Sequence, residues 1–311
     1  MYRETFRTLR LIAQSDVDRT APYDIAYLIR MKDEARSLPA TLDSIRRQRF
    51  AGRAIIIFLD SGSCDESVAI AAACGMPHAI YAIDPREFRF GATCNLIAEL
   101  APARYLLFLS GHVVFNHDDT IATSLAHMDA HADVAALGFR QVPNPTTGFN
   151  LYEQLYIART FPRVDEPYVD IRTAGAFSNA ASLIRTDCWR SIPFEDVIAS
   201  EDHIWAQAAM ARGFAVQYSS AFDVAHSHDE APAAVYKRVR INKVARFGEA
   251  PQPLRFMKTL LGVFMALLTA SRGRRPGFAA TYAWAHASAY VAATNPFASL
   301  LRSSRARDQQ G

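Results

Sequence analysis

The chain has 311 residues, of which half are hydrophobic, 21% are charged and 11% are aromatic, a composition that excludes disordered, fibrous and low-complexity proteins. Its formal net charge of +3 hides an asymmetry, because residues 237–311 carry thirteen Lys and Arg against two acids, a charge of +11, and residues 1–236 carry −8. A basic end on an acidic body predicts an anionic partner at that end, such as a lipid surface, a diphosphate or a nucleic acid, and the alternative is a solvated basic tail.

The first sixteen residues contain no apolar run of the length a secretory signal needs, so we expect none to be removed. The four cysteines, Cys64, Cys74, Cys94 and Cys188, lack the two-residue spacing of zinc ligands. They also lack the density of a disulfide framework, so we expect reduced, mostly buried thiols in a cytoplasmic protein.

In the first half, short apolar runs alternate with helical patterns, which is typical of βαβ units and a mainly parallel sheet. The pattern predicts strands at 24–30, 54–59, 78–83 and 105–109, and helices after Ser37, from about 65 to 74 and from about 91 to 100. Ligands of such sheets bind beyond the carboxyl ends of the strands. Those ends fall at 30–34, 60–65 and 110–112, and neither a dinucleotide fingerprint nor a P-loop follows any of them.

The second half is less regular and predicts a mixed arrangement. We expect a strand at 178–185, a turn at 191–194, a helix from about 200 to 212 and a strand at 214–218, followed by the His pair at 226 and 228. An acceptor site would be built here onto a nucleotide-binding half.

Six segments match one family in its own order. They read LIRMKDEARSLPATLDSI (28–45), FLDSGSCDES (58–67), FGATCN (90–95), YLLFLSGHVV (105–114), FSNAASLIR (177–185), and PFEDVIASEDHIWAQAAMARGFAV (193–216) followed by HSH. The chain resembles the family 2 glycosyltransferases of the GT-A fold, most closely their rhamnosyltransferase-like members. The resemblance implies transfer of a sugar from a nucleotide diphosphate sugar to a hydroxyl, with inversion at the anomeric carbon.

The resemblance implies a catalytic role for the Glu-Asp pair after Ser200. Asp202 would be the general base, taking the proton of the acceptor hydroxyl, and Glu201 a neighbour that tunes or orients it. The alternative is that both acids simply favour the positive end of a helix dipole. Trp205 lies near the face of Asp202 and would stack on a sugar ring, or else pack in the core. Asn179 is the other residue expected to bind the acceptor.

On the donor side, the resemblance implies a nucleotide-sugar pocket at the carboxyl ends of the strands. Its expected residues are Arg30, Lys32, Glu34, Asp60, Gly91, Asn95, Ser110 and His112. For the segment after Asp60 the alternative is turn chemistry alone, because Asp, Ser and Gly all favour turns.

The chain departs from the family where most members carry Asp-x-Asp to hold a divalent cation, because it reads Ser110-Gly111-His112. Related rhamnosyltransferases often carry a similar Ser-Ala-His, so the change does not argue against activity, but it puts a Mg²⁺ or Mn²⁺ cofactor in doubt. Two hypotheses follow: His112 binds a cation with His226 or His228, or a protonated His112 faces the leaving diphosphate directly. Asp118 and Asp119 come too late to replace the missing pair and read as a helix cap.

Cations soon after the His pair are candidates for the diphosphate, namely Lys237, Arg238 and Arg240, or they face solvent. Farther on, residues 259–270 are almost wholly apolar but too few to span a bilayer, and the uncharged stretch 276–301 is a poor spanning helix. Apolar runs flanked by Arg favour attachment to an anionic membrane surface, with packing on the domain or on a second subunit as the alternative.

Together these observations predict an α/β protein with a tail at 1–20, a GT-A domain at 21–250 and a helical basic extension at 251–311. The domain divides into a nucleotide-sugar half, 21–112, and an acceptor half, 113–250. The expected function is an inverting glycosyltransferase of polysaccharide biosynthesis that adds a sugar, rhamnose being the leading candidate, to a glycan or lipid-linked acceptor. It would act in the cytoplasm, at the inner face of the cell membrane. The alternative is a non-catalytic relative that binds a sugar nucleotide or polysaccharide, and no recognised motif supports a nucleic-acid partner.

Overall fold

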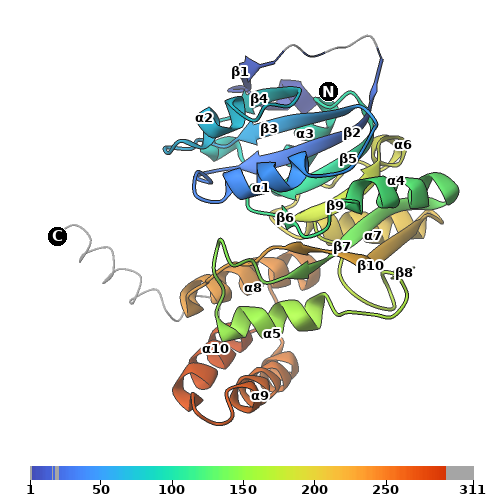
Figure 1. The fold of residues 1–311 in the computed structure, drawn as a ribbon. Helices are drawn as coiled ribbons and strands as arrows, with labels where there is room; N and C mark the ends of the chain where they lie inside the picture. Colours follow the sequence, from blue (N-terminus) through green and yellow to red (C-terminus); the bar gives the residue numbers. More distant parts are fainter. Residues whose placement is uncertain (1, 16, 18–20, 292–311) are drawn as a thin grey trace. The chain divides into compact units, whose positions relative to one another are not determined.

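The computed structural model describes residues 2–15, 17 and 21–291, and its elements are labelled in Figure 1. Contacts within the chain define two compact units. The first comprises residues 1–147 and 157–227, and the second comprises 148–156 and 228–311.

A ten-stranded mixed sheet forms the centre of the first unit, in the order β1-β4-β3-β2-β5-β9-β7-β10-β6, with β8 paired to β10. The strands are β1 (Arg10–Gln14), β2 (Tyr23–Met31), β3 (Ala54–Asp60), β4 (His78–Ala82), β5 (Ala103–Ser110), β6 (Val114–Phe115), β7 (Val134–Val142), β8 (Tyr168–Asp170), β9 (Ala181–Arg185) and β10 (Ala215–Ala225).

The strand directions bring many carboxyl ends to one edge of this sheet. β4, β3, β2 and β5 are parallel neighbours, as the βαβ pattern predicts. β9 then runs antiparallel between β5 and β7, and β10 is parallel to β7. β5, β7 and β10 therefore end at the same edge, and β9 begins there.

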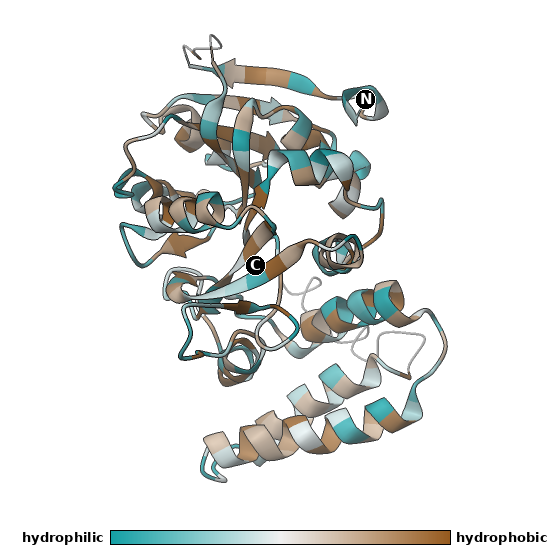
Figure 2. Cartoon of the chain, turned by 90° about the vertical axis from the view of Figure 1, so that its right-hand side faces the viewer, coloured by the Kyte–Doolittle hydropathy of each residue, from teal (hydrophilic) through white to brown (hydrophobic). Residues whose placement is uncertain are grey.

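Helices cover both faces of the sheet, because alternate residues of a strand point to opposite faces. Ile25, Tyr27 and Ile29 of β2 pack with α1 (Leu38–Arg46), α2 (Ser67–Ala72) and α4 (Thr120–Ala130). Ala26 and Leu28 pack on the other side with α3 (Phe90–Glu99), α6 (Thr186–Ser191) and α7 (Glu201–Ala211). β2, β3 and β5 are therefore buried on both faces and read as nearly continuous apolar runs, and Figure 2 shows brown segments within the sheet.

Part of the segment predicted as an N-terminal tail, 1–20, has regular structure. A 3-10 helix, η1 (Tyr2–Thr5), precedes β1, which pairs antiparallel with β4 at the sheet edge. Phe6 is buried in the core beneath them. This apolar anchor orders the segment, and a second 3-10 helix, η2 (Pro85–Glu87), follows β4.

The second unit is helical and has a core of its own. It contains the first turns of α5 (Leu151–Thr160) with α8 (Pro232–Phe247), α9 (Pro253–Ala270) and α10 (Pro276–Ser288). Each of the last three begins with proline, whose fixed φ suits the first helical turn. Tyr152, Val235, Leu267 and Tyr282 share one hydrophobic cluster, so α8 groups with α9 and α10 rather than with the domain predicted to end at 250.

α9 corrects the prediction that the apolar run at 259–270 is too short to span a bilayer. The helix begins six residues earlier, at Pro253, and its 18 residues are long and apolar enough to cross a membrane by length and composition. The last part of the predicted extension, residues 292–311, lies outside the described residues.

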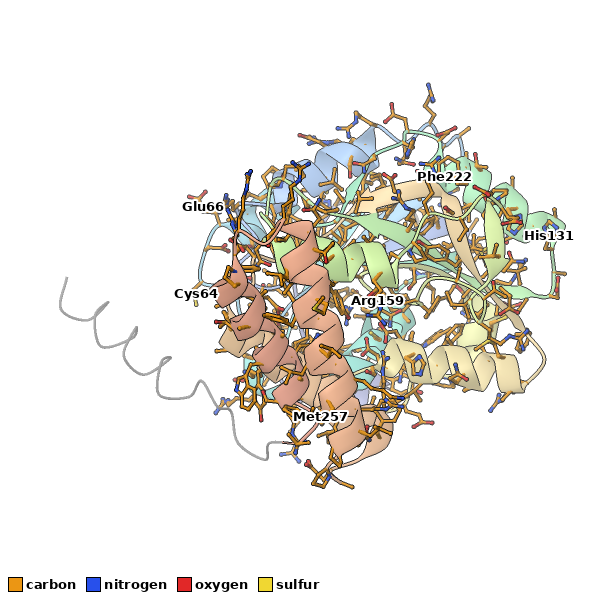
Figure 3. The ribbon with its side chains drawn as sticks, turned by 90° about the horizontal axis from the view of Figure 1, so that it is seen from below. Cys64, Glu66, His131, Arg159, Phe222 and Met257 are labelled. Atoms are coloured by element: carbon orange, nitrogen blue, oxygen red, sulfur yellow. The ribbon has the colours of Figure 1, made fainter. Side chains whose placement is uncertain are left out.

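All four cysteines are free thiols, and three of them are buried, as predicted. Cys64 is exposed in the loop after β3 and is labelled in Figure 3. Burial raises the pKa of Cys188 to about 11, which keeps that thiol protonated at neutral pH.

Candidate active site

The candidate site lies at the sheet edge where the parallel strands end. Arg30 in β2 pairs in register with Ser110 in β5, and the next residue of β2 pairs with Asp60 in β3. Asn179 lies two residues before β9, and His226 directly follows β10. The fold thus brings together residues that are up to 196 positions apart in the sequence.

The predicted Glu-Asp pair occupies the first turn of α7. Ser200 is the N-cap residue and has a left-handed backbone, φ +62°, although its side chain makes no capping hydrogen bond. Glu201 is buried and Asp202 is partly exposed. Adjacent helical positions thus point one acid into the protein and leave the other accessible.

Two backbone N–H groups fix the Asp202 carboxylate. Asn179 N–H donates to Oδ2 at 3.2 Å, and His203 N–H donates to Oδ1 at 2.7 Å. Each oxygen keeps a lone-pair direction, because an ionised carboxylate has about four acceptor sites. Asp202 is therefore held in one orientation with acceptor capacity left over.

Glu201 belongs to a buried polar cluster beneath Asp202. Its Oε1 accepts from Asn179 Nδ2 at 3.3 Å and lies 3.8 Å from Arg30 Nη1. Burial and then the Asp202 charge raise the pKa of Glu201, while Arg30 opposes them. For Arg30, burial lowers the pKa, but the surrounding anionic groups, Glu201 and Asp202 among them, leave it raised. Glu201 thus holds its proton more readily than a free glutamic acid does, and Arg30 keeps its charge.

Arg30 keeps one buried donor without a protein partner. Its Nη2 donates to the Asn179 carbonyl at 3.2 Å. Its Nε has no hydrogen-bond partner in the part of the chain that the structure describes. A buried N–H without a partner is costly, so this atom marks a place where a ligand oxygen would be stabilised.

Asp60 organises its own turn. Its carboxylate accepts from the backbone N–H groups of Gly62 and Ser63 at 3.1 and 3.2 Å, and from Ser63 Oγ at 2.5 Å. Gly62 has φ +86°, a conformation that favours glycine. These contacts favour the turn interpretation for Asp60, with the side chain mostly buried.

The loops after β2 and β3 are bonded to each other. Asp33 N–H donates to Ser63 Oγ at 2.9 Å, and Glu34 N–H donates to Ser67 Oγ at 2.7 Å. Asp33 Oδ1 in turn accepts from Cys64 N–H at 2.7 Å. Lys32, which lies between β2 and Asp33 in the chain, is exposed. The two loops therefore form one preorganised rim.

His112 stands where a metal-binding carboxylate is usual in the resembled family, and Glu34 holds it. Glu34 Oε1 contacts His112 Nδ1 at 2.7 Å, and Glu34 Oε2 accepts from Ser37 Oγ at 2.5 Å. Ser37, the N-cap residue of α1, thus bonds Glu34 instead of capping the helix. Glu34 acts on His112 here, whereas it was predicted to line the nucleotide pocket.

A second imidazole stacks on His112. The rings of His112 and His226 are 5.0 Å apart and 14° from parallel. Gln141 Oε1 contacts His226 Nδ1 at 2.8 Å. In both rings Nδ1 faces an oxygen acceptor, so Nδ1 carries the proton and the lone pair of the neutral ring is on Nε2.

These two residues fit a cation that prefers nitrogen ligands. Their ligand nitrogens lie within 4.8 Å of each other, and each ring is oriented by an outer partner, as metal-bound histidines usually are. Mg²⁺ prefers oxygen ligands and fits this pair poorly. His228 is the first residue of the second unit along that stretch of chain, so its role as a third ligand stays a prediction.

Asn95 and Gly91 have structural roles, which corrects their prediction as donor-binding residues. Buried Asn95 donates to the Phe194 carbonyl at 2.8 Å and accepts from Phe194 N–H and Trp189 Nε1. A Cβ on Gly91 would lie 1.7 Å from the Glu195 carbonyl oxygen, so only glycine lets α3 approach this segment. Both residues shape the approach to α7.

Trp205 and Asn179 are also corrected from acceptor-binding to structural roles, because both side chains are buried. Trp205 is 1% exposed, packs against Phe177 and Phe194, and donates Nε1–H to the Ile192 carbonyl at 2.6 Å. Asn179 is also 1% exposed, and it holds the Glu-Asp pair as described above.

The predicted diphosphate cations lie in the second unit. Arg238 forms ion pairs with Glu153 at 3.2 Å and Glu230 at 2.7 Å and stacks over Tyr156, so it is a core ion pair and not a free phosphate ligand. Arg240 pairs with Glu249. Lys237 is exposed, and its role in diphosphate binding stays a prediction.

Sequence reasoning missed several residues of this site. Gln141 orients His226, and Asn144 Nδ2 donates to the His112 carbonyl at 2.7 Å. Gln141 lies near the end of β7 and Asn144 follows that strand, which the sequence pattern did not predict. A buried apolar run at 134–139 was the available signal.

The sheet topology and the helices on both its faces define the class of protein as one with a GT-A fold. Two solved structures are similar to it. They are the mannosyltransferase PcManGT from Pyrobaculum calidifontis in complex with GDP-Man and Mn²⁺ (TM-score 0.57, 16% identity, 98% of this chain and 85% of that chain) and S. aureus TarS 1–349 in complex with UDP (TM-score 0.52, 16% identity, 82% and 74%). At this identity the likeness concerns the fold alone.

Residues 28–189 match the model of glycosyl transferase family 2. The match covers just over half of the chain, so the protein belongs to this glycosyltransferase family. Two O-antigen chain rhamnosyltransferases are similar: RfbN of Salmonella typhimurium (28% identical over 211 residues, 64% of this chain) and WbaN of Salmonella anatum (26% over 195 residues, 59%). The aligned part spans 65% and 59% of the length of these relatives.

Proposed function

We propose that the protein moves a sugar from a nucleotide diphosphate sugar to a hydroxyl of a glycan or lipid-linked acceptor, with inversion. The observation that carries the proposal is Asp202, a partly exposed carboxylate fixed by two backbone N–H groups at the carboxyl edge of the sheet. A general base must be oriented before the reaction and must keep a free lone pair.

Asp202 takes the proton of the acceptor hydroxyl as its oxygen attacks the anomeric carbon. The bond from that carbon to the diphosphate oxygen breaks on the opposite face, and the nucleoside diphosphate leaves with the electron pair. Glu201 does not compete for the acceptor, because it is buried and its pKa is raised by burial. Glu201, Arg30 and Asn179 act as positioning residues for Asp202.

The donor lies, in this proposal, along the rim formed by the loops after β2, β3 and β5. Arg30 Nε supplies a buried donor for a ligand oxygen. Lys32, Asp60 and Ser110 stand at the same strand ends, where ligands of open α/β sheets bind. The proposal therefore keeps Lys32 and Ser110 as donor contacts, and Asp60 shapes the turn beside them.

The leaving diphosphate needs a positive group beside it, and His112 is our candidate for providing that group, either by holding a cation or by carrying the charge itself. A divalent cation would neutralise the developing charge on the diphosphate, and His112 and His226 would hold it, with His228 as a further candidate. Imidazole ligands suit softer divalent cations better than magnesium. The alternative is a protonated His112, in contact with Glu34, which would face the diphosphate without a metal.

The relatives suggest the finer assignment. Two are rhamnosyltransferases of O-antigen chains, so we propose rhamnose as the sugar and polysaccharide biosynthesis as the process. A cytoplasmic location at the inner face of the cell membrane belongs to the same proposal.

The test combines nucleotide binding with transfer. Melting-temperature shifts with UDP, GDP and dTDP, each with and without Mn²⁺ or Mg²⁺, would identify the donor nucleotide, because a ligand that binds the native state raises its stability. With the matching sugar nucleotide, Asp202→Asn should reduce turnover about 10²- to 10⁴-fold and leave the nucleotide shift unchanged.

Asp187→Asn is the matched control, because Asp187 is an exposed acid in the first turn of another helix, α6. It should leave both properties unchanged. Nucleotide binding without any transfer by the unmodified protein would instead favour the non-catalytic relative, which lacks Asp-x-Asp.

A further inference from the structure

α9 exposes a stripe of large hydrophobic side chains. Leu254, Met257, Leu261 and Met265 recur at helical spacing and are 68, 58, 65 and 49% exposed. Met257 is labelled in Figure 3. Only 6% of the helix is buried, although its composition is apolar enough for a membrane span.

The opposite side of α9 is anchored in the second unit. Leu267 is buried, and Val263, Phe264 and Leu268 pack against the cluster that contains Tyr282. Because this side of α9 packs into the core of the second unit, the stripe on its other side is left exposed.

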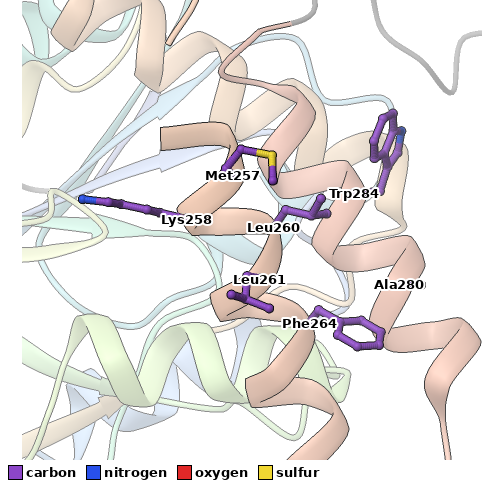
Figure 4. A pocket seen from close by; sticks show the side chains of 7 residues that line it. All are labelled: Met257, Lys258, Leu260, Leu261, Phe264, Ala280 and Trp284. Carbon is purple, nitrogen blue, oxygen red and sulfur yellow. The ribbon is translucent and has the colours of Figure 1, made fainter. Parts of the chain in front are cut away.

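A groove deepens the apolar surface between α9 and α10. It has a volume of about 700 Å³. Trp284 of α10 is half exposed at its edge and makes an edge-to-face contact with Phe256, ring centroids 5.7 Å apart. Figure 4 shows the lining side chains, which are Met257, Lys258, Leu260, Leu261, Phe264, Ala280 and Trp284.

Cations and no anions accompany this surface. Arg255 and Lys258 are exposed on α9, and Arg272, Arg274 and Arg275 are exposed in the turn before α10. No Asp or Glu occurs from 250 to 291. A contiguous apolar face bordered only by cations is typical of helices that lie in an anionic lipid interface.

The charges favour lipid over a second copy of the chain. A two-fold dimer through this face would bring the same five cations of both copies together without an acid between them. Anionic headgroups neutralise those cations, and acyl chains cover the stripe and the groove.

We propose that the α9–α10 hairpin is a membrane-docking surface that binds anionic phospholipid, with α9 lying in the plane of the interface. The side of α9 that carries Leu267 packs in one cluster with Tyr282 and stays in the protein core, which a spanning helix would have to leave. The docking proposal rests on the proposed function in one respect, that a lipid-linked acceptor would lie at the membrane. Lipid binding itself needs neither the sugar donor nor catalysis.

Sedimentation of the full-length protein with vesicles tests it. We expect binding to phosphatidylglycerol–phosphatidylcholine vesicles and little to phosphatidylcholine alone, with binding reduced at high salt. Lys258→Gln, Arg274→Gln and Arg275→Gln should each lower the partition coefficient about fivefold. Leu254→Ser with Leu261→Ser should lower it at least tenfold.

Leu11→Ser with Ile12→Ser is the matched control, because these residues are also exposed hydrophobics but lie in β1. It should sediment like the unmodified protein. All variants should keep their nucleotide-induced melting shift, which separates failure of docking from failure of the transferase proposal.

Three results would overturn the proposal. The first is equal binding to vesicles with and without anionic lipid, and the second is sedimentation of the α9 variants like the control. The third is a concentration-dependent dimer that buries the stripe, without vesicle binding. Resistance of the bound protein to an alkaline carbonate wash would replace the interfacial orientation with a spanning one.

Discussion

β2 and α9 are both predominantly apolar, yet seven of the nine residues of β2 are buried and only one of the eighteen residues of α9 is. β2 lies in mid-sheet with helices on both faces, so every side chain has a partner. α9 packs along one side only. An apolar run therefore predicts that its side chains will be buried, and the residues beside the run indicate what buries them. β2 is followed by polar residues and is buried inside the protein, whereas α9 is accompanied by cations and remains exposed.

Two of the three tryptophans, Trp205 and Trp284, give the sharpest test of this contrast. Trp205→Ala should cost about 3–5 kcal/mol of unfolding free energy, because it empties a packed site between Phe177 and Phe194. Trp284→Ala, at the exposed groove, should change it by about 0.5 kcal/mol or less. Urea unfolding followed by far-UV circular dichroism measures both, and equal costs would erase the distinction.

A buried ion pair tests whether the second unit has a true core beside its exposed helix. Arg238→Met should cost about 3 kcal/mol, because it leaves the buried Glu153 without its cation. Arg240→Met removes a cation whose partner, Glu249, is exposed and should cost less than about 1 kcal/mol. Thermal melting compares the two, and similar melting temperatures would mean that α8 is not held by its ion pairs.

Asn179→Ala tests the buried polar cluster at the sheet edge of the first unit, in contrast to the buried apolar strands. It should cost about 1–3 kcal/mol, because Glu201 and Ser182 lose buried hydrogen bonds. Turnover should fall while nucleotide binding is retained, since Asp202 loses a rigid neighbour. Ser178→Ala is the control, and a variant with unchanged turnover would remove Asn179 from the positioning residues.

Glu201 makes the stability of the first unit depend on pH. Its pKa is raised in the folded state, so the folded protein holds this proton above the pH where the unfolded chain releases it. This contribution to stability is therefore present at acidic pH and is lost as pH rises through the folded pKa. Glu201→Gln should flatten that dependence in urea unfolding from pH 4 to 8, and an unchanged slope would contradict the raised pKa.

The smallest effect is expected on α9 itself. Leu261→Ser should change the unfolding free energy by about 0.5 kcal/mol or less in the absence of lipid, because the side chain is 65% exposed. A loss of 2 kcal/mol would show that the stripe is covered within the protein, and the contrast with β2 would fail.

The parallel strands could be predicted because a strand buried on both faces has no polar alternation to interrupt its apolar run. The structure confirms the strands predicted at 24–30, 54–59 and 105–109 to within two residues at each end. The direction of β9 could not be read, since an apolar run carries no information on which neighbour it pairs with.

The site was predictable in position and less so in role. Chain order locates Asp202 and His112 at strand or helix ends, where ligands gather. It does not say which way a side chain points, so Asn95, Asn179 and Trp205 seemed to be ligand contacts and prove to be buried supports. The bond between Glu34 and His112 joins residues 78 positions apart, which no local pattern encodes.

That bond also limits how the site can change. Asp in place of His112 would set a second carboxylate against Glu34, already engaged with Ser37, at a site where two anions repel. Gly111 tightens the constraint, because a Cβ there would come within 2.9 Å of the Glu34 side chain. A change to the two-carboxylate arrangement would therefore require Glu34 to change together with position 112. We expect the effects of the two substitutions to be non-additive, with the single substitution His112→Asp destabilising.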